Sequence, residues 1–153
     1  MALQQLKSFL DRQRTKYQII THSPAYTAQE IAATAHIPGK MLAKTVIVKL
    51  DGKMAMAVLP AHRLVNLQDL RDVTGYEDVQ FAREEEFRAV FPECEVGAMP
   101  PLGPIYGMDV YVAEELTYDQ DIVFNACSHT ELIRMRFEDF ERLVQPRVVS
   151  FVA

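Results

Sequence analysis

Lys44 stands out among the residues that could do chemistry, because it lies in a run of apolar and β-branched residues. Residues 41–60 form two such runs joined by Asp51-Gly52, a dipeptide typical of a two-residue hairpin turn. With that turn, Lys44 lies opposite Leu59 and shares its face with small and aliphatic side chains. A lysine there buries its stem and directs its ammonium to an anion. It could pair with a carboxylate at a sheet edge, or it could hold a phosphate or carboxylate at the mouth of a pocket.

A second chemical candidate is the irregular stretch from Gly97 to Gly107. It holds three glycines and three prolines in eleven residues. Glycines let backbone N–H groups approach a ligand, and successive N–H groups can form an anion-binding concavity. Pro100-Pro101 donates no hydrogen bond and fixes the path of the chain, which reduces the ordering entropy lost on binding. The stretch is therefore either a ligand-binding loop or a rigid surface connection.

The histidines and cysteines carry weaker signals. The four histidines have no metal-ligand spacing, and no phosphate-binding, dinucleotide-binding or zinc-protease motif is present, so neither a metal nor a cofactor is predicted. Cys127 and His129 would share a strand face, a spacing that seldom aligns two groups for proton transfer. Cys94 is interpreted as an ordinary thiol near a turn. Two cysteines without a C-x-x-C pair fit a reducing compartment and argue against a disulfide scaffold.

The composition is that of an ordinary globular protein. The 153 residues predict one domain, residues 1–153, and 49% hydrophobic with 24% charged residues is typical of such a domain. There is no apolar run of membrane-spanning length, and the N-terminus lacks the uninterrupted hydrophobic stretch of a signal peptide. A cytoplasmic protein with no membrane partner is therefore predicted.

Charge is unevenly distributed along the chain. The net charge is −5, yet residues 1–63 hold nine Lys/Arg and three Asp/Glu. An acidic protein is a poor candidate for binding duplex DNA, because phosphate neutralisation supplies most of that affinity. Lys40, Lys44 and Arg63 could still form a local basic surface that holds a single-stranded nucleic acid end.

Hydrophobic spacing and capping signals place these candidates on a mixed α and β scaffold. One helix is predicted in the N-terminal segment, and a second from a Thr27 capping box to about residue 35. A third is predicted from an Asn66 N-cap to about residue 73, before Gly75, and two more over 83–90 and over 137–144. Strands are predicted over 17–20, on both sides of Asp51-Gly52, over 109–112, over 122–126 and near 130–135, and the apolar tail 146–153 is expected to pack or pair. Because the hairpin is apolar on both faces, the fold class is α+β, with a mixed, strongly curved or barrel-like sheet and surrounding helices.

Three segments resemble one family in the same order along the chain: HIPGKMLAKTVIVKLDGKMAMAVLPAHR at 36–63, GAMPPLG at 97–103 and FNACSHTELIRM at 124–135. They are similar to the YbaK / prolyl-tRNA synthetase-associated family, free-standing relatives of the editing domain inserted in bacterial prolyl-tRNA synthetases. The resemblance covers about residues 15–145. It implies a YbaK-like fold and an aminoacyl-tRNA deacylase, a hydrolase that cleaves the ester joining a wrong amino acid to the 3′ end of tRNA.

The resemblance also assigns roles to individual residues. Lys44 matches the essential lysine of the family, and the loop residues Gly97, Pro100, Pro101 and Gly103 match its substrate-cradling loop. An aminoacyl ester is already activated, so such a site needs position, a water molecule and stabilisation of an oxyanion. Lys44 would then bind the terminal phosphate or orient the 3′ end. Amides from Gly97 to Gly103 would hold the ester carbonyl or the attacking water.

The amino-acid pocket is expected to involve Thr45, Ser128 and His129 together with the two loop prolines. His129 matches a histidine that some members place at this pocket. Thr45 replaces the asparagine of alanine-editing members, and Cys127 replaces a glycine that commonly precedes Ser/Thr-His. The predicted substrate is the ester of a small amino acid, Ser, Thr, Ala or Cys. A small polar one is favoured because these side chains could hydrogen-bond it.

The expected partners are the 3′ end of aminoacyl-tRNA and an aminoacyl-tRNA synthetase. Two other functions stay open. A non-catalytic module of the same fold would recruit tRNA ends or a synthetase without turnover. A hydrolase of another small ester or nucleotide conjugate would need no tRNA body.

Overall fold

The computed structural model describes residues 2–23, 30, 33, 35 and 37–153. The helix expected to begin at the Thr27 capping box lies largely outside these residues. The helices are α1 (Ala2–Arg12), α3 (Leu67–Thr74), α4 (Glu84–Phe87), α5 (Gly103–Tyr106) and α6 (Phe137–Val144), with 3-10 turns η1 (Gly39–Met41), η2 (Arg88–Val90) and η3 (Glu114–Tyr118). The strands are β1 (Tyr17–Thr21), β2 (Leu42–Leu50), β3 (Lys53–Pro60), β4 (Val79–Phe81), β5 (Val110–Ala113), β6 (Asp121–Asn125), β7 (Glu131–Arg136) and β8 (Arg147–Val149).

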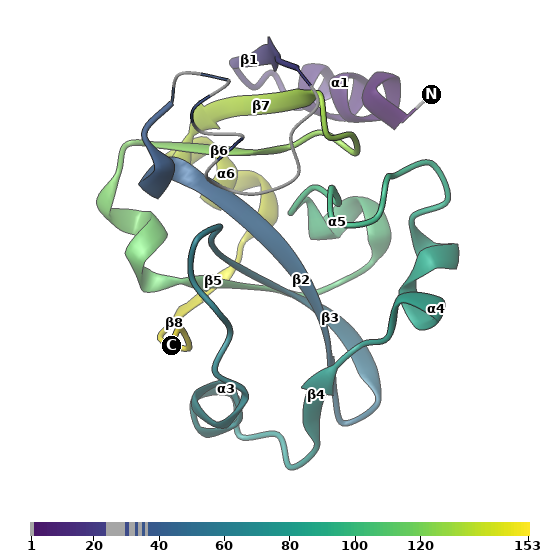
Figure 1. The fold of residues 1–153 in the computed structure, drawn as a ribbon, viewed down its shortest axis with the longest axis vertical. Coiled ribbons are helices and arrows are strands. Elements are labelled where there is room, and N and C mark those ends of the chain that lie inside the picture. Colours follow the sequence, from purple (N-terminus) through teal and green to yellow (C-terminus); the bar gives the residue numbers. More distant parts are fainter. Residues whose placement is uncertain (1, 24–29, 31–32, 34, 36) are drawn as a thin grey trace.

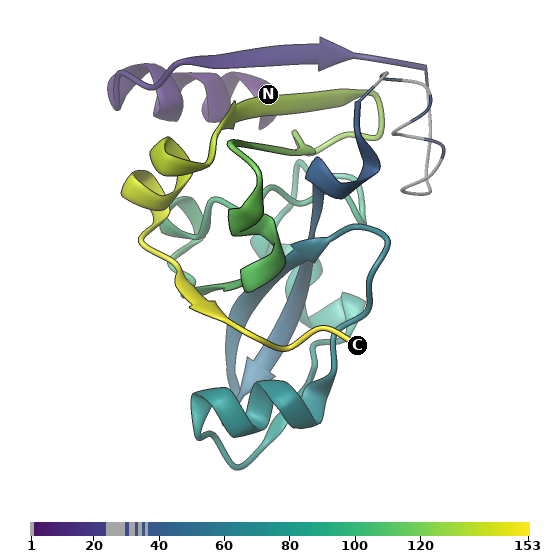
Figure 2. The same ribbon diagram turned by 90° about the vertical axis from the view of Figure 1, so that its left-hand side faces the viewer.

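These strands form one curled, mixed sheet. Its order is β1-β7-β6-β2-β3-β5-β8, with β4 also paired to β2. The β2–β6, β3–β5 and β5–β8 pairs are parallel and the others are antiparallel. Figure 1 shows the β2–β3 hairpin running diagonally through the molecule, and Figure 2 shows α1, β1 and β7 at one end and α3 at the other. The predicted α+β class and mixed, curved sheet are confirmed.

The central hairpin has the predicted register. Lys44 pairs with Leu59, and Leu50 pairs with Lys53 across the Asp51-Gly52 turn. Both turn residues have positive φ, 50° and 85°, as a tight turn between twisted strands requires. The long β2 strand therefore presents alternate side chains to two different environments.

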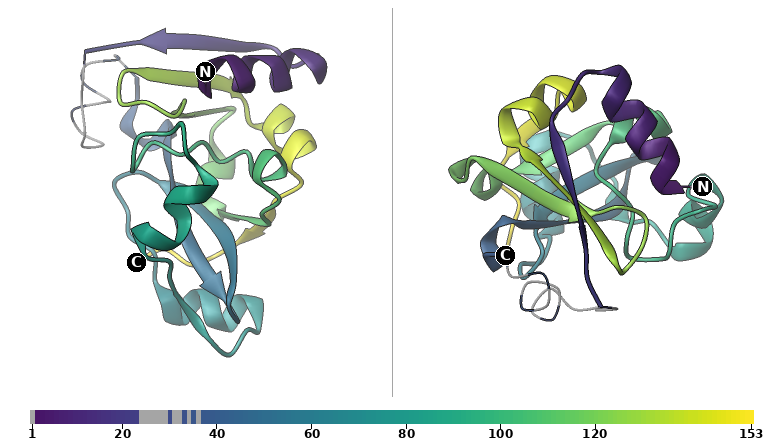
Figure 3. Two further views of the ribbon diagram at one scale, coloured as in Figure 1. Left: turned by 90° about the vertical axis from the view of Figure 1, so that its right-hand side faces the viewer. Right: turned by 90° about the horizontal axis from the view of Figure 1, so that it is seen from above.

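Each face of the hairpin is covered by its own core cluster. Ala43 and Ile47 of β2 belong to the larger cluster, which also holds side chains of α1 and α6. In the left view of Figure 3, α1 lies next to β1 and β7, and α6 lies at the end of β7. Val48 and Leu59 belong to the second cluster, which includes α3 and the fully buried Phe151. The apolar tail therefore packs as expected, with β8 paired to β5.

Several predicted helices have the expected ends. The Asn66 side chain caps α3 by accepting a hydrogen bond from Asp69 N at 3.0 Å, and Gly75 ends it with φ +79°. α6 covers the predicted 137–144.

Other elements differ from the sequence prediction. Residues 83–90 form only one α-helical turn, α4, and continue as the 3-10 turn η2. The stretch from Gly97 to Gly107 contains the short helix α5, with Pro104 in its first turn, where proline is well tolerated. β4 is an additional strand on β2. Among the described residues, no helix is long and apolar enough to cross a bilayer.

Candidate functional site

One edge of β2 changes partner along its length. β6 pairs with this edge at Leu42 and Ala43, and β4 pairs with it at Val48–Leu50. Between the two, in the described part of the chain, residues 44–46 have no strand partner on this edge. Gaps between diverging strands are common places for ligands in mixed sheets, because the backbone there is not covered by a neighbour.

Lys44 lies in this gap. Its side chain is half-buried, and burial lowers the pKa of its ammonium. The neighbouring lysines have carboxylate partners: Lys49 Nζ lies 2.7 Å from Glu86 Oε2, and Lys40 Nζ lies 3.4 Å from Asp119 Oδ1. Across the described ranges, Lys44 has neither an ion pair nor a hydrogen bond from its ammonium. A half-buried ammonium without a fixed counterion is suited to an anionic ligand.

The C-terminal end of β6 brings a second polar group to Lys44. Ala43 pairs with Phe124, so one step further along both parallel strands sets Asn125 beside Lys44. Asn125 is only 8% exposed, and its Oδ1 has no hydrogen-bond partner among the described residues. Such buried polar atoms are uncommon and call for an explanation, of which a ligand is one. The only sequence signal for Asn125 is a polar residue inside an otherwise apolar strand.

Thr45 lies on the opposite face of β2 from Lys44. It is 8% exposed, pairs with Val58 and shares its face with Ala43 and Ile47 of the larger core cluster. Its Oγ1 also has no hydrogen-bond partner within the described residues. The structure therefore separates the Thr45 hydroxyl from the Lys44 ammonium, because adjacent strand residues point to opposite faces.

Gly97 and His129 lie against each other. Gly97 is exposed and has φ +88°, and a Cβ built on it would lie 3.6 Å from His129 Cε1. His129 Nε2 donates to the Val96 carbonyl oxygen at 3.0 Å, which places the proton of a neutral ring on Nε2. Glu95 Oε2 accepts a hydrogen bond from His129 N at 2.8 Å. Glu95, which nothing in the sequence singled out, thus helps to fix the position of His129.

The other loop residues of the predicted site, Pro100, Pro101 and Gly103, are buried. A Cβ on Gly103 would overlap the Met108 carbonyl oxygen, so the start of α5 requires glycine. Of the four loop residues in the predicted site, Gly97 is the one whose backbone is exposed.

The Ser128 hydroxyl, next to His129 in the sequence, already has hydrogen-bond partners. Its Oγ donates to Glu131 Oε1 at 3.2 Å and lies 3.3 Å from Thr130 Oγ1. Glu131 is the first residue of β7 and Thr130 directly precedes it, so the Ser128 hydroxyl stabilises the turn between β6 and β7.

A disulfide joins Cys94 and Cys127. The interpretation of Cys94 as a free thiol and the argument against a disulfide are therefore wrong. The residues are 33 positions apart, so only the folded chain brings the turn after η2 to the end of β6. Backbone hydrogen bonds join the same two segments: Glu95 N donates to the Cys127 carbonyl, and Cys127 N donates to the Ala98 carbonyl, both at 2.9 Å.

Cys127 has a backbone conformation unusual for a cysteine. Its φ is +67°, in the left-handed region that favours glycine. Cys127 lies outside any strand, so it does not share a strand face with His129 as expected.

The candidate site residues form two groups around the C-terminal end of β6. Lys44 and Asn125 lie at the open edge of β2, and Gly97 and His129 lie just beyond the end of β6 that borders this edge. The arrangement offers a cation, a buried side-chain amide, the exposed backbone of a glycine and a histidine. In the described part of the chain, no three side chains of His, Cys, Asp or Glu come together as metal ligands would.

Comparison with known proteins identifies the family. The profile of the aminoacyl-tRNA editing domain matches residues 22–143. The prolyl-tRNA editing protein ProX of Acetoanaerobium sticklandii is 23% identical over 153 aligned residues, covering 94% of this chain and 91% of that protein. A proline–tRNA ligase of Staphylococcus epidermidis is 33% identical over 97 residues, covering 63% of this chain, and the chain spans only 16% of the ligase.

Solved structures share the fold. One, described as a candidate trans-editing enzyme for prolyl-tRNA synthetase, superposes with a TM-score of 0.83 at 17% identity, over 99% of this chain and 97% of that one. The profile covers most of the sequence, and its bounds contain Lys44, the Gly97 loop and His129. The chain therefore belongs to the aminoacyl-tRNA editing domain family.

Proposed function

We propose that this chain is a trans-editing aminoacyl-tRNA deacylase, with residues 1–153 acting as one editing domain. It hydrolyses the ester of a mischarged small amino acid and releases the amino acid and the tRNA with a free 3′ end. The observation that carries the proposal is the half-buried Lys44, without a described counterion, in the gap between β6 and β4. A cytoplasmic location follows, because aminoacyl-tRNA is made and used there.

Lys44 has the role of anion binder in this proposal. A phosphate of the terminal nucleotide would supply the charge that the site lacks, and this charge would raise the pKa that burial lowers. The lysine would thereby hold the 3′ end so that the ester lies beside Gly97. Position is the main requirement, since the ester is already an activated bond.

Gly97 and His129 would surround the reacting ester. The exposed Gly97 backbone can approach the ester carbonyl or the attacking water without a side chain in the way. The His129 ring would form one wall of the amino-acid pocket, fixed by Glu95 and Val96. A pocket with these walls suits a small side chain, so Ser, Thr, Ala and Cys esters are the proposed substrates.

The tRNA and its synthetase are the proposed partners. Relatives of this chain form one segment of proline–tRNA ligases, which supports an association with prolyl-tRNA or with the ligase that makes it. The acidic chain would recognise the tRNA end rather than its duplex body.

The direct test is to incubate the protein with tRNAs charged with Ala, Ser, Thr, Cys or Pro and to measure the ester that remains. Lys44→Ala should abolish the loss of ester. Lys53→Ala is the matched control, because Lys53 is an exposed lysine of the same hairpin next to the turn. Survival of every ester with the wild type would contradict the deacylase and favour the non-catalytic module. Equal cleavage of a short aminoacyl-adenosine would favour a hydrolase that needs no tRNA body.

A further inference from the structure

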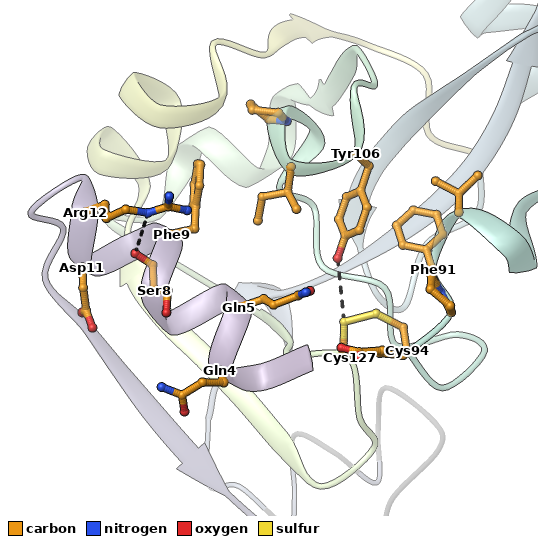
Figure 4. A pocket seen from close by; sticks show the side chains of 15 residues that line it. Gln4, Gln5, Ser8, Phe9, Asp11, Arg12, Phe91, Cys94, Tyr106 and Cys127 are labelled. Atoms are coloured by element: carbon orange, nitrogen blue, oxygen red, sulfur yellow. Dashed lines mark hydrogen bonds between the residues drawn. A yellow bond between two sulfur atoms is a disulfide. The ribbon is translucent and has the colours of Figure 1, made fainter. Parts of the chain in front are cut away.

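The Cys94–Cys127 disulfide lies in the wall of a large cavity. The cavity has a volume of about 1160 Å³ and is lined by α1, by the turn around Cys94 and by α5. Figure 4 shows the two sulfur atoms facing this space, with the Tyr106 ring beside them. Cys94 is half-buried, whereas Cys127 is 4% exposed. A space of this size admits a small molecule, and Cys94 is the more accessible of its two sulfur-bearing residues.

The same disulfide is directly connected to the candidate site. Cys94 precedes Glu95 and Val96, whose oxygens accept the hydrogen bonds from His129. Cys127 stands two residues before His129. The covalent bond therefore fixes the distance between the turn that bears His129 and the loop that holds it.

We propose that Cys94–Cys127 is a site of reversible thiol–disulfide exchange with a low-molecular-weight thiol, which enters through this cavity and thereby adjusts the editing site. The exchange itself is independent of the function proposed above, while its effect on editing rests on that function.

The exchange proceeds in two balanced steps. The thiolate of the small thiol attacks Cys94 Sγ, a mixed disulfide forms, and the Cys127 thiolate leaves and takes up a proton. A second molecule of the thiol attacks the mixed disulfide, so Cys94 becomes a thiol and the small disulfide is released. Two small thiols are thus oxidised and one protein disulfide is reduced, and the small disulfide drives the reverse reaction.

Tyr106 is placed to assist the first step. Its hydroxyl oxygen lies 3.9 Å from Cys127 Sγ. Burial raises the pKa of Tyr106 to about 12, so the hydroxyl keeps its proton and can donate to the departing thiolate. A hydrogen-bond donor beside a leaving sulfur makes that thiolate a better leaving group.

Reduction should change the site without unfolding it. The two backbone hydrogen bonds between the segments of Cys94 and Cys127 do not depend on the sulfur bond. These hydrogen bonds are therefore expected to persist, whereas the His129 turn and the Glu95–Gly97 segment lose their covalent link and can move more relative to each other. We expect the reduced protein to cleave its ester several-fold more slowly than the oxidised protein.

The first experiment measures exchange alone. Folded protein is equilibrated in buffers of defined reduced-to-oxidised glutathione ratio, thiols are trapped by alkylation, and intact mass gives the oxidised fraction. The expected result is a reversible titration with the mixed disulfide on Cys94, which the Cys127→Ser variant should accumulate. A disulfide reduced only after denaturant is added would overturn the proposal. So would two thiols that never oxidise in the folded protein.

A second experiment tests the route. Ser8 is an exposed residue of α1 that lines the cavity, so Ser8→Trp should slow reduction by glutathione several-fold. Gln68→Trp is the control, because Gln68 is exposed on α3 at the other end of the molecule. Equal reduction rates in the two variants would exclude the cavity as the route.

The third experiment separates this inference from the proposed function. Deacylation is measured for oxidised protein, reduced protein and Cys94→Ser, which should behave like the reduced form and ignore glutathione. Equal activity in all three would overturn the regulatory effect while leaving the deacylase intact. If no form deacylates any ester, the mass titration still decides whether the exchange site exists.

Discussion

Gly97 and His129 lie so close that a Cβ on the glycine would sit 3.6 Å from His129 Cε1. That distance is an ordinary contact, so a methyl group fits but fills the space beside the ring. The pair joins the glycine-rich loop to the turn after β6, two segments more than thirty residues apart in sequence. Their contact is the basis for the first prediction.

Gly97→Ala should reduce deacylation by between about tenfold and about a hundredfold, because misplacing a substrate by a fraction of an ångström has effects of this size. It should also lower the free energy of unfolding by about 1 kcal/mol, since alanine is strained at positive φ. Gly75→Ala is the matched control: Gly75 has φ +79° and open space around it. Equal activity of the two variants would remove Gly97 from the site.

Gly103→Ala should lower the free energy of unfolding. Its methyl would overlap the Met108 carbonyl oxygen, and overpacking of a buried backbone costs about 1–3 kcal/mol. Urea unfolding measures this loss. The activity per folded molecule at low urea should change little. A stable but inactive variant would instead support a catalytic role for Gly103.

Lys44→Met should abolish deacylation and stabilise the protein. Removing a half-buried charge without a described counterion is expected to raise the free energy of unfolding. Lys44→Arg keeps the charge and should keep part of the activity. A less stable Lys44→Met protein would show that the ammonium already has a stabilising partner.

The stability gained by Lys44→Met should depend on pH. Burial lowers the pKa of Lys44 in the folded protein below its usual 10.5, so the unfolded chain binds this proton more tightly. The destabilisation caused by the charged Lys44 side chain is complete at neutral pH. It is relieved as pH rises through the lowered pKa toward 10.5. The difference between wild type and variant should therefore shrink over that window, as chemical denaturation at several pH values would reveal.

Glu86 gives a prediction at acidic pH. The hydrogen bond from the Lys49 ammonium, followed by the backbone hydrogen bond from Arg83, holds the pKa of Glu86 at about 2, compared with 4.5 ordinarily. Its stabilising effect is present above 4.5 and is lost as pH falls toward 2. Glu86→Gln should flatten the acid unfolding curve in this range. Glu77→Gln, which changes an exposed carboxylate in the turn before β4, should not.

Glu95 is predicted to be a positioning residue for His129. Glu95→Ala should lower kcat/KM about tenfold, which corresponds to the loss of one hydrogen bond to a charged group. Glu95→Gln keeps an acceptor oxygen and should restore most of the activity. If both variants were equally impaired, charge rather than the hydrogen bond to His129 N would be the relevant property.

Local patterns were sufficient for the central scaffold. The Asp51-Gly52 turn and the alternation of side chains predicted the register that pairs Lys44 with Leu59, because both depend only on neighbouring residues. The Asn66 cap and Gly75 likewise fixed the ends of α3. Short elements such as β4 and α5 were not predicted, because three or four residues carry too little periodic signal. Whether they form also depends on the segments that they pack against.

The sequence by itself determined the family motifs, the hairpin and the strand on which Lys44 lies, because these follow from residue types at fixed spacing. Only the tertiary structure decided that Thr45 faces the core, that Gly103 is required by packing and that Glu95 contacts His129. It also joined Cys94 to Cys127. The physical reason is that the Cys94–Cys127 and Glu95–His129 contacts link segments distant in the chain, while the packing at Thr45 and Gly103 depends on which parts of the folded chain cover them.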